Sequence, residues 1–358
     1  MIKCHSSIEG AQHGGKGLEG FLKFAAGAGA AGVQPSNFML QKPGGSLMSA
    51  AEIKQVFDKV ATDLNLTAPF KLDGVSIHCP TWVLLTAWTG SKTIRPFIPA
   101  EVRRLCPDEI EQWAEDQILA LFDLFAELKV RIVPMFWGVA YGWELATGYP
   151  WGLWSGGEGD YAYDLIAEGK ERFVAKTAKI RARANELGIF LAHEIHPGTA
   201  AQCAEEFAIL VRICSGDPCL TVNGDPSHCW DGESMRTRFL HPAVAPRVVG
   251  CHVKNHTILA GQPLRCMEPD WQKRPMQFTD LRSGDIKLVR YVELMHRIGY
   301  VERYCTLTGS ETAPLVTEAE SAFMSLDACA ADAIRYTNRR LCFEVATGSF
   351  EDGMGEQS

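Results

Sequence analysis

The sequence predicts a protein of the α/β class that folds as a single (β/α)8 barrel, also called a TIM barrel. Its 358 residues are 46% hydrophobic and 22% charged, unlike those of disordered, collagen-like or coiled-coil chains. Short apolar, β-branched runs alternate with longer amphipathic stretches, which predicts parallel strands joined by helices. There are eight such runs, and eight strand–helix units favour a closed barrel over an open sheet.

The expected elements follow one another along the chain. The expected strands are Ile2–Ile8, Gly32–Leu40, Gly74–His78, Val130–Phe136, Ile189–Ile195, Cys219–Gly224, Val248–Val253 and a run within Tyr304–Glu320. Amphipathic spacing predicts helices over Pro107–Leu128, Ala167–Leu187, Gly198–Ile213, Ile286–Ile298 and Ala322–Arg340. The Ala/Gly-rich stretch Phe21–Val33 is too short to cross a membrane and is expected to be a helix followed by a turn.

One barrel domain is expected over residues 1–347, because no short repeat and no interior Gly/Ser linker divides the chain. Gly348–Ser358 is rich in glycine and acidic residues and is expected to be a flexible tail. Three segments exceed what a bare barrel needs, and each follows a predicted strand: Thr81–Cys106, Gly138–Asp160 and His256–Gly284. They are therefore expected over the C-terminal mouth, where barrel enzymes place their active sites.

Charge and cysteine usage restrict the partners and the compartment. The net charge is −8, and no block of five like charges occurs, so a nucleic-acid partner is not expected. The twelve cysteines are scattered without a CxxC pair, which favours reduced cysteines in a cytoplasmic protein over a disulfide scaffold. No secretory leader and no apolar run of about 18 residues is visible, so no membrane span is expected.

Ionisable residues gather where the predicted strands end. Side chains alternate along a strand, so Glu194 and His196 are expected to point the same way, as are His252 and Lys254. The candidates are His193, Glu194 and His196 after strand five, Asp225 and His228 after strand six, His252, Lys254 and His256 after strand seven, and Glu311, Glu318 and Glu320 in the eighth unit.

A glutamate, an aspartate, a histidine and a second glutamate from four consecutive strands form a candidate site for a divalent cation. Carboxylates with one imidazole suit Mn²⁺, Mg²⁺ or Co²⁺, with Mn²⁺ favoured, whereas Zn²⁺ usually takes more nitrogen or sulfur ligands. For any one of these residues, the alternative is a hydrogen-bonded role in the scaffold. Four such residues on successive strands favour the metal site.

This pattern resembles the xylose isomerase-like barrel superfamily, in its sugar isomerase and epimerase branch. That family carries a Glu on strand five, an Asp followed three residues later by His on strand six, an HxK on strand seven and a Glu on strand eight. The matching residues are Glu194, Asp225 with His228, His252 with Lys254, and a glutamate of the last unit. The resemblance implies that Glu194, Asp225, His252 and Glu318 hold the metal.

The eighth-strand ligand has two candidates. Glu318 follows the apolar residues of APLVT, whereas Glu311 lies in GSETAP, where Pro314 is expected to interrupt any strand. Glu318 is therefore preferred. The segment Glu302–Pro314 looks like an insertion relative to the family and leaves the register of strand eight open.

The resemblance also implies a reaction. Members of the family remove a proton next to a carbonyl, and a divalent metal stabilises the negative charge that develops. Glu194 and Glu318 would act from opposite faces of the substrate, which inverts a stereocentre. The leading function is therefore isomerisation or epimerisation of a sugar, keto-sugar or 3-oxo-glycoside.

His196 indicates an alternative reaction. The Glu194-x-His196 pair and the long loops are similar to those of the catalytic subunits of C-glycoside deglycosidases. A base at this position could drive β-elimination from a 3-oxo-glycoside, which would make the protein a lyase. The alternative is that His196 only orients a metal ligand.

Several residues are candidate substrate contacts. The resemblance implies that His228 contacts a hydroxyl group of the substrate. Lys254 could hold a substrate oxygen, and the alternative is an ion pair with Asp225 or a nearby glutamate. Trp151 and Trp154 lie in an aromatic segment that suits sugar stacking, loop packing or an oligomer contact equally. The earlier strands offer the polar residues His5, Gln34, Ser36 and His78.

Two further functions are open to a barrel of this kind. A metal-free carbohydrate-binding barrel is the main non-catalytic alternative, and an abasic-site endonuclease is disfavoured by the acidic charge. A homo-oligomer is compatible with the sequence. The long segments over the mouth favour a substrate larger than a free monosaccharide.

Overall fold

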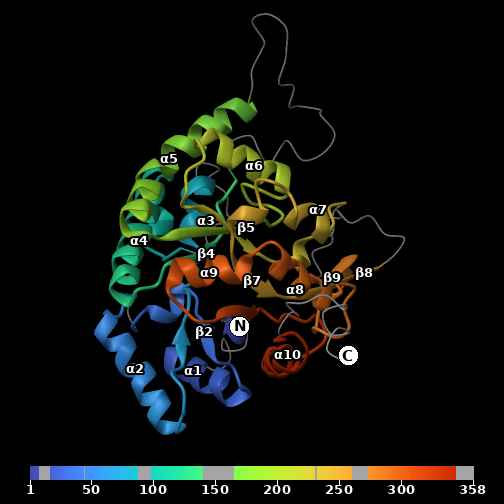
Figure 1. Cartoon of the computed structure of the whole chain (residues 1–358). Coiled ribbons are helices and arrows are strands. Elements are labelled where there is room, and N and C mark those ends of the chain that lie inside the picture. The colour runs from blue at the N-terminus through green and yellow to red at the C-terminus, as the bar shows by residue number, and fades with distance from the viewer. Residues whose placement is uncertain are drawn as a thin grey trace, which may run out of the picture.

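The computed structural model describes residues 1–7, 17–43, 45–87, 98–139, 165–229, 232–259 and 273–343. Eight strands pair in parallel in the order β3-β2-β1-β10-β7-β6-β5-β4, which is the order of a TIM barrel (Figure 1). The strands are β1 (Ile2–Ser7), β2 (Gly32–Gln34), β3 (Lys71–Leu72), β4 (Ile132–Met135), β5 (Phe190–Glu194), β6 (Leu220–Gly224), β7 (Val248–Val253) and β10 (Ala313–Thr317).

The two edge strands are joined by the residues that follow β3. Gly74 bridges Ile132, and Ile77 bridges Met135, both in parallel with β4. The expected strand Gly74–His78 therefore does lie between β2 and β4, but it pairs through isolated bridges rather than a continuous ladder. These bridges bring the first and last strands of the sheet together, as barrel closure requires.

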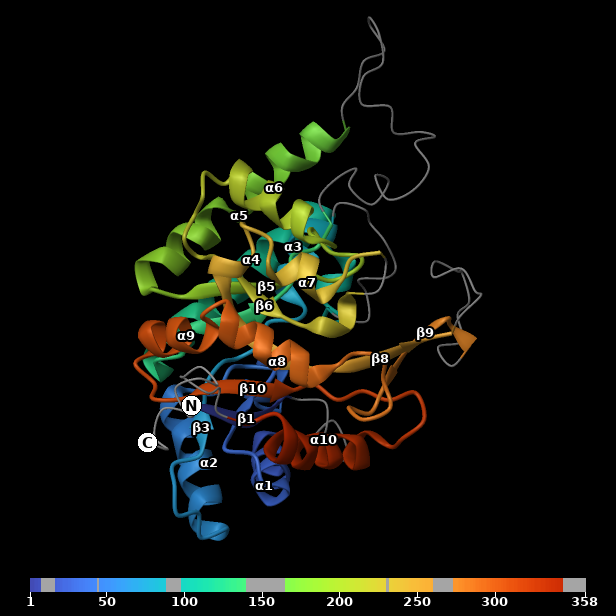
Figure 2. The ribbon, with the colours of Figure 1, turned by 45° about the vertical axis from the view of Figure 1, so that its right-hand side comes forward.

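Helices surround the strands on the outside (Figures 1 and 2). They are α1 (Gly17–Ala28), α2 (Ala50–Asp63), α3 (Pro80–Thr86), α4 (Pro107–Leu128), α5 (Leu165–Leu187), α6 (Ala204–Ile213), α7 (Met235–Phe239), α8 (Leu288–Arg297), α9 (Tyr300–Thr308) and α10 (Leu326–Arg340), with the 3₁₀ turns η2 (Asn37–Leu40), η5 (Val102–Arg104), η8 (Pro226–His228) and η9 (Ala245–Arg247). Their buried faces pack on the strands and form one continuous hydrophobic core.

Local sequence explains where these helices begin and end. Ser49 and Glu52 cap α2 reciprocally, with the Ser49 N–H donating to Oε2 of Glu52 at 2.8 Å. Pro107 starts α4, where a missing N–H is harmless, and Lys129 ends it in the left-handed conformation. The expected helix Pro107–Leu128 and strand Val248–Val253 match the structure residue for residue.

Two expectations about strands were wrong. Strand β2 stops at Gln34 rather than Leu40, because Pro35 has no N–H and Ser36 caps the turn η2. Pro314 does not interrupt a strand but lies inside β10. It is tolerated there because the ladder with β7 involves only Val316 and Thr317. The expected insertion Glu302–Pro314 contains most of helix α9, which begins at Tyr300.

The long segments are described in part. After β7, strands β8 (Asn255–Ile258) and β9 (Met276–Thr279) form an antiparallel hairpin, which Figure 2 shows projecting beside β10. Residues 88–97, 140–164 and 260–272 lie outside the described residues, as does the predicted tail at 348–358. Among the helices that the structure describes, none is both long and apolar enough to cross a membrane.

Candidate metal centre

Four ionisable side chains meet at the carboxyl ends of four neighbouring strands. Glu194 is the last residue of β5, Asp225 follows β6, His252 lies near the end of β7, and Glu318 follows β10. One donor atom from each lies within 4.8 Å of the others, and all four residues are buried. The structure thus brings together the four residues that the sequence proposed as metal ligands.

Glu194 uses both carboxylate oxygens. Its Oε1 lies 3.1 Å from Nε2 of His228, and its Oε2 accepts a hydrogen bond from Nδ2 of Asn223 at 2.9 Å. Oε2 also lies 3.1 Å from Nδ1 of His252. Glu194 therefore connects the turn after β6 with the end of β7.

His252 lies at the centre of the group. Its Nδ1 is 3.1 Å from Oε2 of Glu194 and 3.0 Å from Oε2 of Glu318, while its Nε2 is 2.7 Å from Oε1 of Gln34. The imidazole thus turns one nitrogen toward two carboxylates and the other toward a neutral amide.

Asp225 has one oxygen engaged and one available. Its Oδ1 accepts a hydrogen bond from the N–H of Ser227 at 2.7 Å, which begins the turn η8. Its Oδ2 is buried and makes no hydrogen bond within the described chain, although Nε2 of His228 is 3.5 Å away. A buried carboxylate oxygen without a hydrogen bond is costly unless a cation or another donor reaches it.

Burial and close charges shift the protonation of the group in opposite directions. Burial raises the pKa of Glu194, but hydrogen bonds with His228 and His252 outweigh it and hold this pKa well below its usual range. Burial also raises the pKa of Glu318, and the charges of Lys254 and His252 lower it on balance. Burial lowers the pKa of His252, whereas the two glutamates raise it well above its usual value. Both glutamates are therefore ionised at neutral pH.

Lys254 lies next to the carboxylates. Its Nζ is 2.9 Å from Oε2 of Glu320, 3.6 Å from Oε2 of Glu318, and 4.1 Å from the centre of the Phe278 ring. Burial lowers the pKa of this ammonium, but Glu318 and Glu320 raise it well above its usual value, so Lys254 is charged. The alternative that the sequence allowed for Lys254, an ion pair at the mouth, is therefore present. Its partners are Glu318 and Glu320 rather than Asp225.

His196 belongs to a row of rings across the mouth. Its ring centre lies 4.0 Å from that of His228 and 5.6 Å from that of Phe136, and His228 in turn meets Phe278 at 5.7 Å. Burial and the neighbouring His228 lower the pKa of His196 to about 3, so this imidazole is neutral. Glu194, His196 and His228 also have donor atoms within 4.8 Å of one another.

The donor set fits a divalent cation. Three buried carboxylates repel one another in a low-dielectric site, and a bound cation removes that repulsion. The set offers one nitrogen and several oxygens, which suits Mn²⁺ or Mg²⁺ better than the nitrogen- and sulfur-rich sites of Zn²⁺. Oδ2 of Asp225 supplies an acceptor that has no other hydrogen bond in the described chain.

The other predicted residues lie in different places. His193 faces away from the cluster, with Nδ1 accepting from the N–H of Trp137, and burial lowers its pKa to about 4. His5 pairs with Asp73, and His78 meets the Phe136 ring edge-on. Glu311 is exposed and is not part of the cluster. Trp151 and Trp154 lie outside the described residues.

Two residues of the candidate site were not predicted from the sequence. Asn223 is buried and donates to Glu194 from the neighbouring strand, two residues before Asp225. Phe278 reaches Lys254 and His228 from the β8–β9 hairpin. The alternation of β6 could have indicated Asn223, because residues 223 and 225 share a face of an extended strand.

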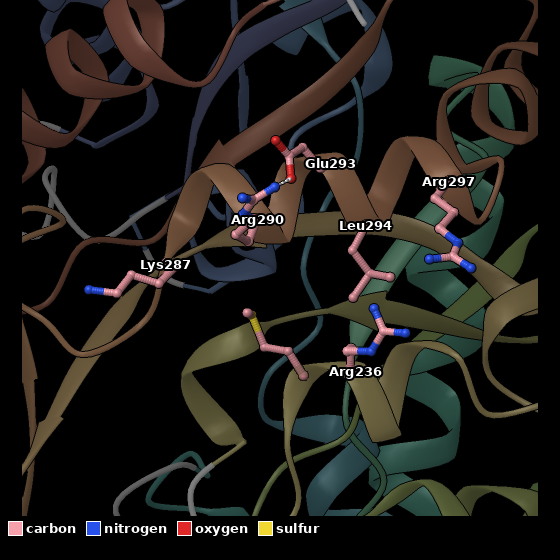
Figure 3. A pocket seen from close by; sticks show the side chains of 7 residues that line it. Arg236, Lys287, Arg290, Glu293, Leu294 and Arg297 are labelled. Carbon is pink, nitrogen blue, oxygen red and sulfur yellow. Dashed lines mark hydrogen bonds and ion pairs between the residues drawn. The ribbon is translucent and has the colours of Figure 1, made fainter. Parts of the chain in front are cut away.

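A separate cavity lies on the outer wall. It has a volume of about 540 Å³ and lies between α7 and α8, with exposed Arg236, Lys287, Arg290 and Arg297 around it (Figure 3). Among the described residues, Glu293 is the only carboxylate that lines it, and this residue pairs with Arg290 at 2.7 Å. None of the proposed metal ligands lines this cavity.

Known proteins resemble the chain in sequence pattern and in fold. The family model described as "Xylose isomerase-like TIM barrel" matches residues 22–326. No curated protein matches the chain in sequence.

Solved structures share the fold at low identity. A probable 3-DHS dehydratase from Bacillus anthracis has a TM-score of 0.59 at 13% identity, over 94% of this chain and 99% of that one. An L-ribulose 3-epimerase has a TM-score of 0.58 at 13% identity, over 95% and 94%. A xylose isomerase-like TIM barrel protein from Mycobacterium smegmatis, in complex with magnesium, has a TM-score of 0.54 at 16% identity, over 94% and 95%.

Proposed function

Because the chain belongs to the xylose isomerase-like TIM barrel family, we propose that it is a divalent-metal-dependent isomerase or epimerase. It would remove a proton next to the carbonyl of a sugar, a keto-sugar or a 3-oxo-glycoside. The observation that carries this proposal is the meeting of Glu194, Asp225, His252 and Glu318 within 4.8 Å at the strand ends. An L-ribulose 3-epimerase among the structures with this fold is compatible with it.

The four clustered residues would hold the cation, with Mn²⁺ favoured by the carboxylate-rich donor set. When bound, the ion supplies a Lewis acid that polarises a carbonyl and stabilises negative charge on oxygen. All other steps fall to side chains of this chain.

Proton transfer is assigned to the two glutamates. Glu194 and Glu318 approach Nδ1 of His252 from two different strands, β5 and the end of β10, so they flank the space between these strands. Both are ionised at neutral pH, and each could therefore accept a proton from carbon. If one removes the proton and the other returns it from the opposite face, the stereocentre inverts.

Substrate binding is assigned to Lys254 and His228. Nζ of Lys254 lies against Glu318 and could donate to a substrate oxygen beside the base. His228 contacts Oε1 of Glu194 and could donate its remaining ring N–H to a hydroxyl group. Trp151 and Trp154 stay proposed stacking residues for the sugar.

A lyase acting on a 3-oxo-glycoside is the second candidate. The observation that favours it is His196, which stands against His228 at 4.0 Å beside Glu194 and so places a neutral imidazole within the same mouth. As a neutral imidazole, His196 could act as the base that takes the proton next to the carbonyl, and the imidazolium so formed could give that proton to the leaving atom. One structure with the same fold is described as a probable 3-DHS dehydratase, and dehydratases work by elimination.

The proposal also includes the size of the substrate and the compartment in which the protein works. The β8–β9 hairpin adds cover beside the mouth, which favours a substrate larger than a free monosaccharide. The eleven described cysteines are all free, which favours a reducing compartment such as the cytoplasm.

Product analysis with two substrates tests the proposal. The protein with Mn²⁺ is incubated with a 3-oxo-glucoside and with free fructose, and the products are identified by NMR. Epimerisation of the larger substrate supports the first candidate, and release of its aglycone supports the lyase. Faster turnover of fructose would contradict the large-substrate claim. Carbohydrate binding without any turnover or bound metal would favour the non-catalytic barrel.

A further inference from the structure

Gln34 touches the cluster from a distant strand. It is the last residue of β2, and its side chain is buried, with 2% of the residue exposed. Its Oε1 lies 2.7 Å from Nε2 of His252, a residue 218 positions later in the chain. Gln34 thus contacts the nitrogen of His252 that faces away from the carboxylates, because Nδ1 faces Glu194 and Glu318.

The surroundings of Gln34 hold its amide in place. The hydroxyl of Ser76 donates to Oε1 of Gln34 at 3.4 Å, so two donors converge on this oxygen. Nε2 of Gln34 lies against Gly74, where an added Cβ would come within 3.1 Å of it and within 2.9 Å of the Ile132 carbonyl. The absence of a side chain at position 74 thus leaves room for the amide.

We propose that Gln34 is a positioning residue that directs Nδ1 of His252 toward the bound cation. The inference rests on the proposed function, because it takes His252 as a metal ligand. A neutral imidazole carries one proton on either nitrogen, and only the nitrogen without it can bind a metal. A carbonyl oxygen at Nε2 can only accept, so it fixes the proton there and keeps the lone pair of Nδ1 available.

The neutral amide also suits the charge of the site. Three buried carboxylates already surround the cation site, and a glutamate in place of Gln34 would add a fourth. Gln34 orients the imidazole without that added charge. Since partners of this kind are worth about 10–100-fold in metal affinity, their removal is measurable without any substrate.

The test is the affinity of the full-length protein for Mn²⁺, measured by EPR of the free ion. Gln34→Met keeps the length of the side chain and removes the acceptor, and we expect the dissociation constant for Mn²⁺ to rise about 10–100-fold. Gln34→Glu keeps an oxygen acceptor at this position, and this variant is expected to bind Mn²⁺ within about threefold of the wild type, or more tightly. Gln112→Met makes the same change on the exposed face of α4 and should leave the affinity unchanged.

The outcomes separate this inference from the proposed function. If the wild type binds Mn²⁺ and Gln34→Met binds it equally well, the role of Gln34 is wrong and the metal function stands. If the wild type binds no Mn²⁺, the metal function itself is wrong. Should Gln34→Met fail to fold, ¹⁵N NMR of histidine in the Mg²⁺-loaded wild type decides. A proton on Nε2 of His252 supports the inference, and a proton on Nδ1 overturns it.

Discussion

Oε1 of Glu194 lies 3.1 Å from Nε2 of His228, while Oε2 of the same carboxylate faces Nδ1 of His252. One side chain from β5 therefore joins the proposed substrate contact to the proposed metal ligands. This arrangement makes Glu194 the residue whose replacement should disturb most of the site at once.

Glu194→Gln should lose activity by about 10²–10⁴-fold or more, because general-base catalysis alone contributes about that much. The amide carries no charge, and it must point an NH₂ group at either His228 or His252. Steady-state kinetics on the substrate that the product analysis identifies measure the loss. Glu127→Gln, on the exposed end of α4, is the matched control and should retain full activity. Retention of more than a tenth of the activity by Glu194→Gln would contradict its role as base.

The two candidate glutamates of the eighth unit give opposite expectations. Glu318→Gln should weaken Mn²⁺ binding by at least about tenfold, since outer partners of ligands alone are worth that much. Glu311→Gln should leave it unchanged, because Glu311 is exposed and lies outside the cluster. Isothermal titration of both variants with Mn²⁺ makes the comparison. A reversal of the two results would move the ligand to Glu311.

His196→Ala distinguishes a residue that transfers a proton from a residue that binds the metal. His196 is outside the group of four, so the variant should bind Mn²⁺ within about threefold of the wild type while losing about 10²–10⁴-fold in turnover. His241→Ala, just after α7, removes an imidazole that pairs with Glu205 on the outer surface and serves as the control. Complete loss of bound metal in His196→Ala would place this imidazole among the ligands.

Much of the candidate site was predictable because the functional side chains of a barrel lie at the C-terminal ends of its strands. Glu194, Asp225 and His252 lie at the ends of runs whose apolar pattern is unambiguous, and their sequence neighbours locate each strand end to within a residue or two. The choice of Glu318 over Glu311 likewise followed from the apolar run before it. The structure places Glu318 in the cluster and Glu311 outside it.

The parts of the fold and of the site that the sequence did not predict depend on contacts between segments far apart in the chain. Gln34 and His252 meet across strands that are not neighbours in the sequence, and no local pattern pairs them. Phe278 reaches Lys254 only because the segment after β7 forms a hairpin. The expected third strand, Gly74–His78, differs from β3 (Lys71–Leu72), because Gly74, Ser76 and Ile77 pair through single bridges rather than a continuous ladder.

The barrel interior gives a prediction for stability. At Gly32 an added Cβ would lie 2.6 Å from the Lys71 carbonyl and against the His5 ring, so Gly32→Ala should lower the free energy of unfolding by about 1–3 kcal/mol or more. Gly27→Ala is the control, because it lies in α1 with nothing within 4 Å and should raise stability by up to about 1 kcal/mol. Urea unfolding measures both. Equal stability of the two variants would contradict the close packing at Gly32.

The proposed function requires that a metal-dependent base of this protein removes a proton next to the carbonyl of the substrate. The most direct measurement is deuterium incorporation from D₂O into a panel of keto-sugars and 3-oxo-glycosides, followed by ¹H NMR. Epimerisation and elimination both begin with this step, so both reactions should show it. We expect exchange at the carbon beside the carbonyl that requires Mn²⁺, stops with a chelator and is lost in Glu194→Gln. Exchange that continues after chelation, or no exchange with any member of the panel, would contradict it.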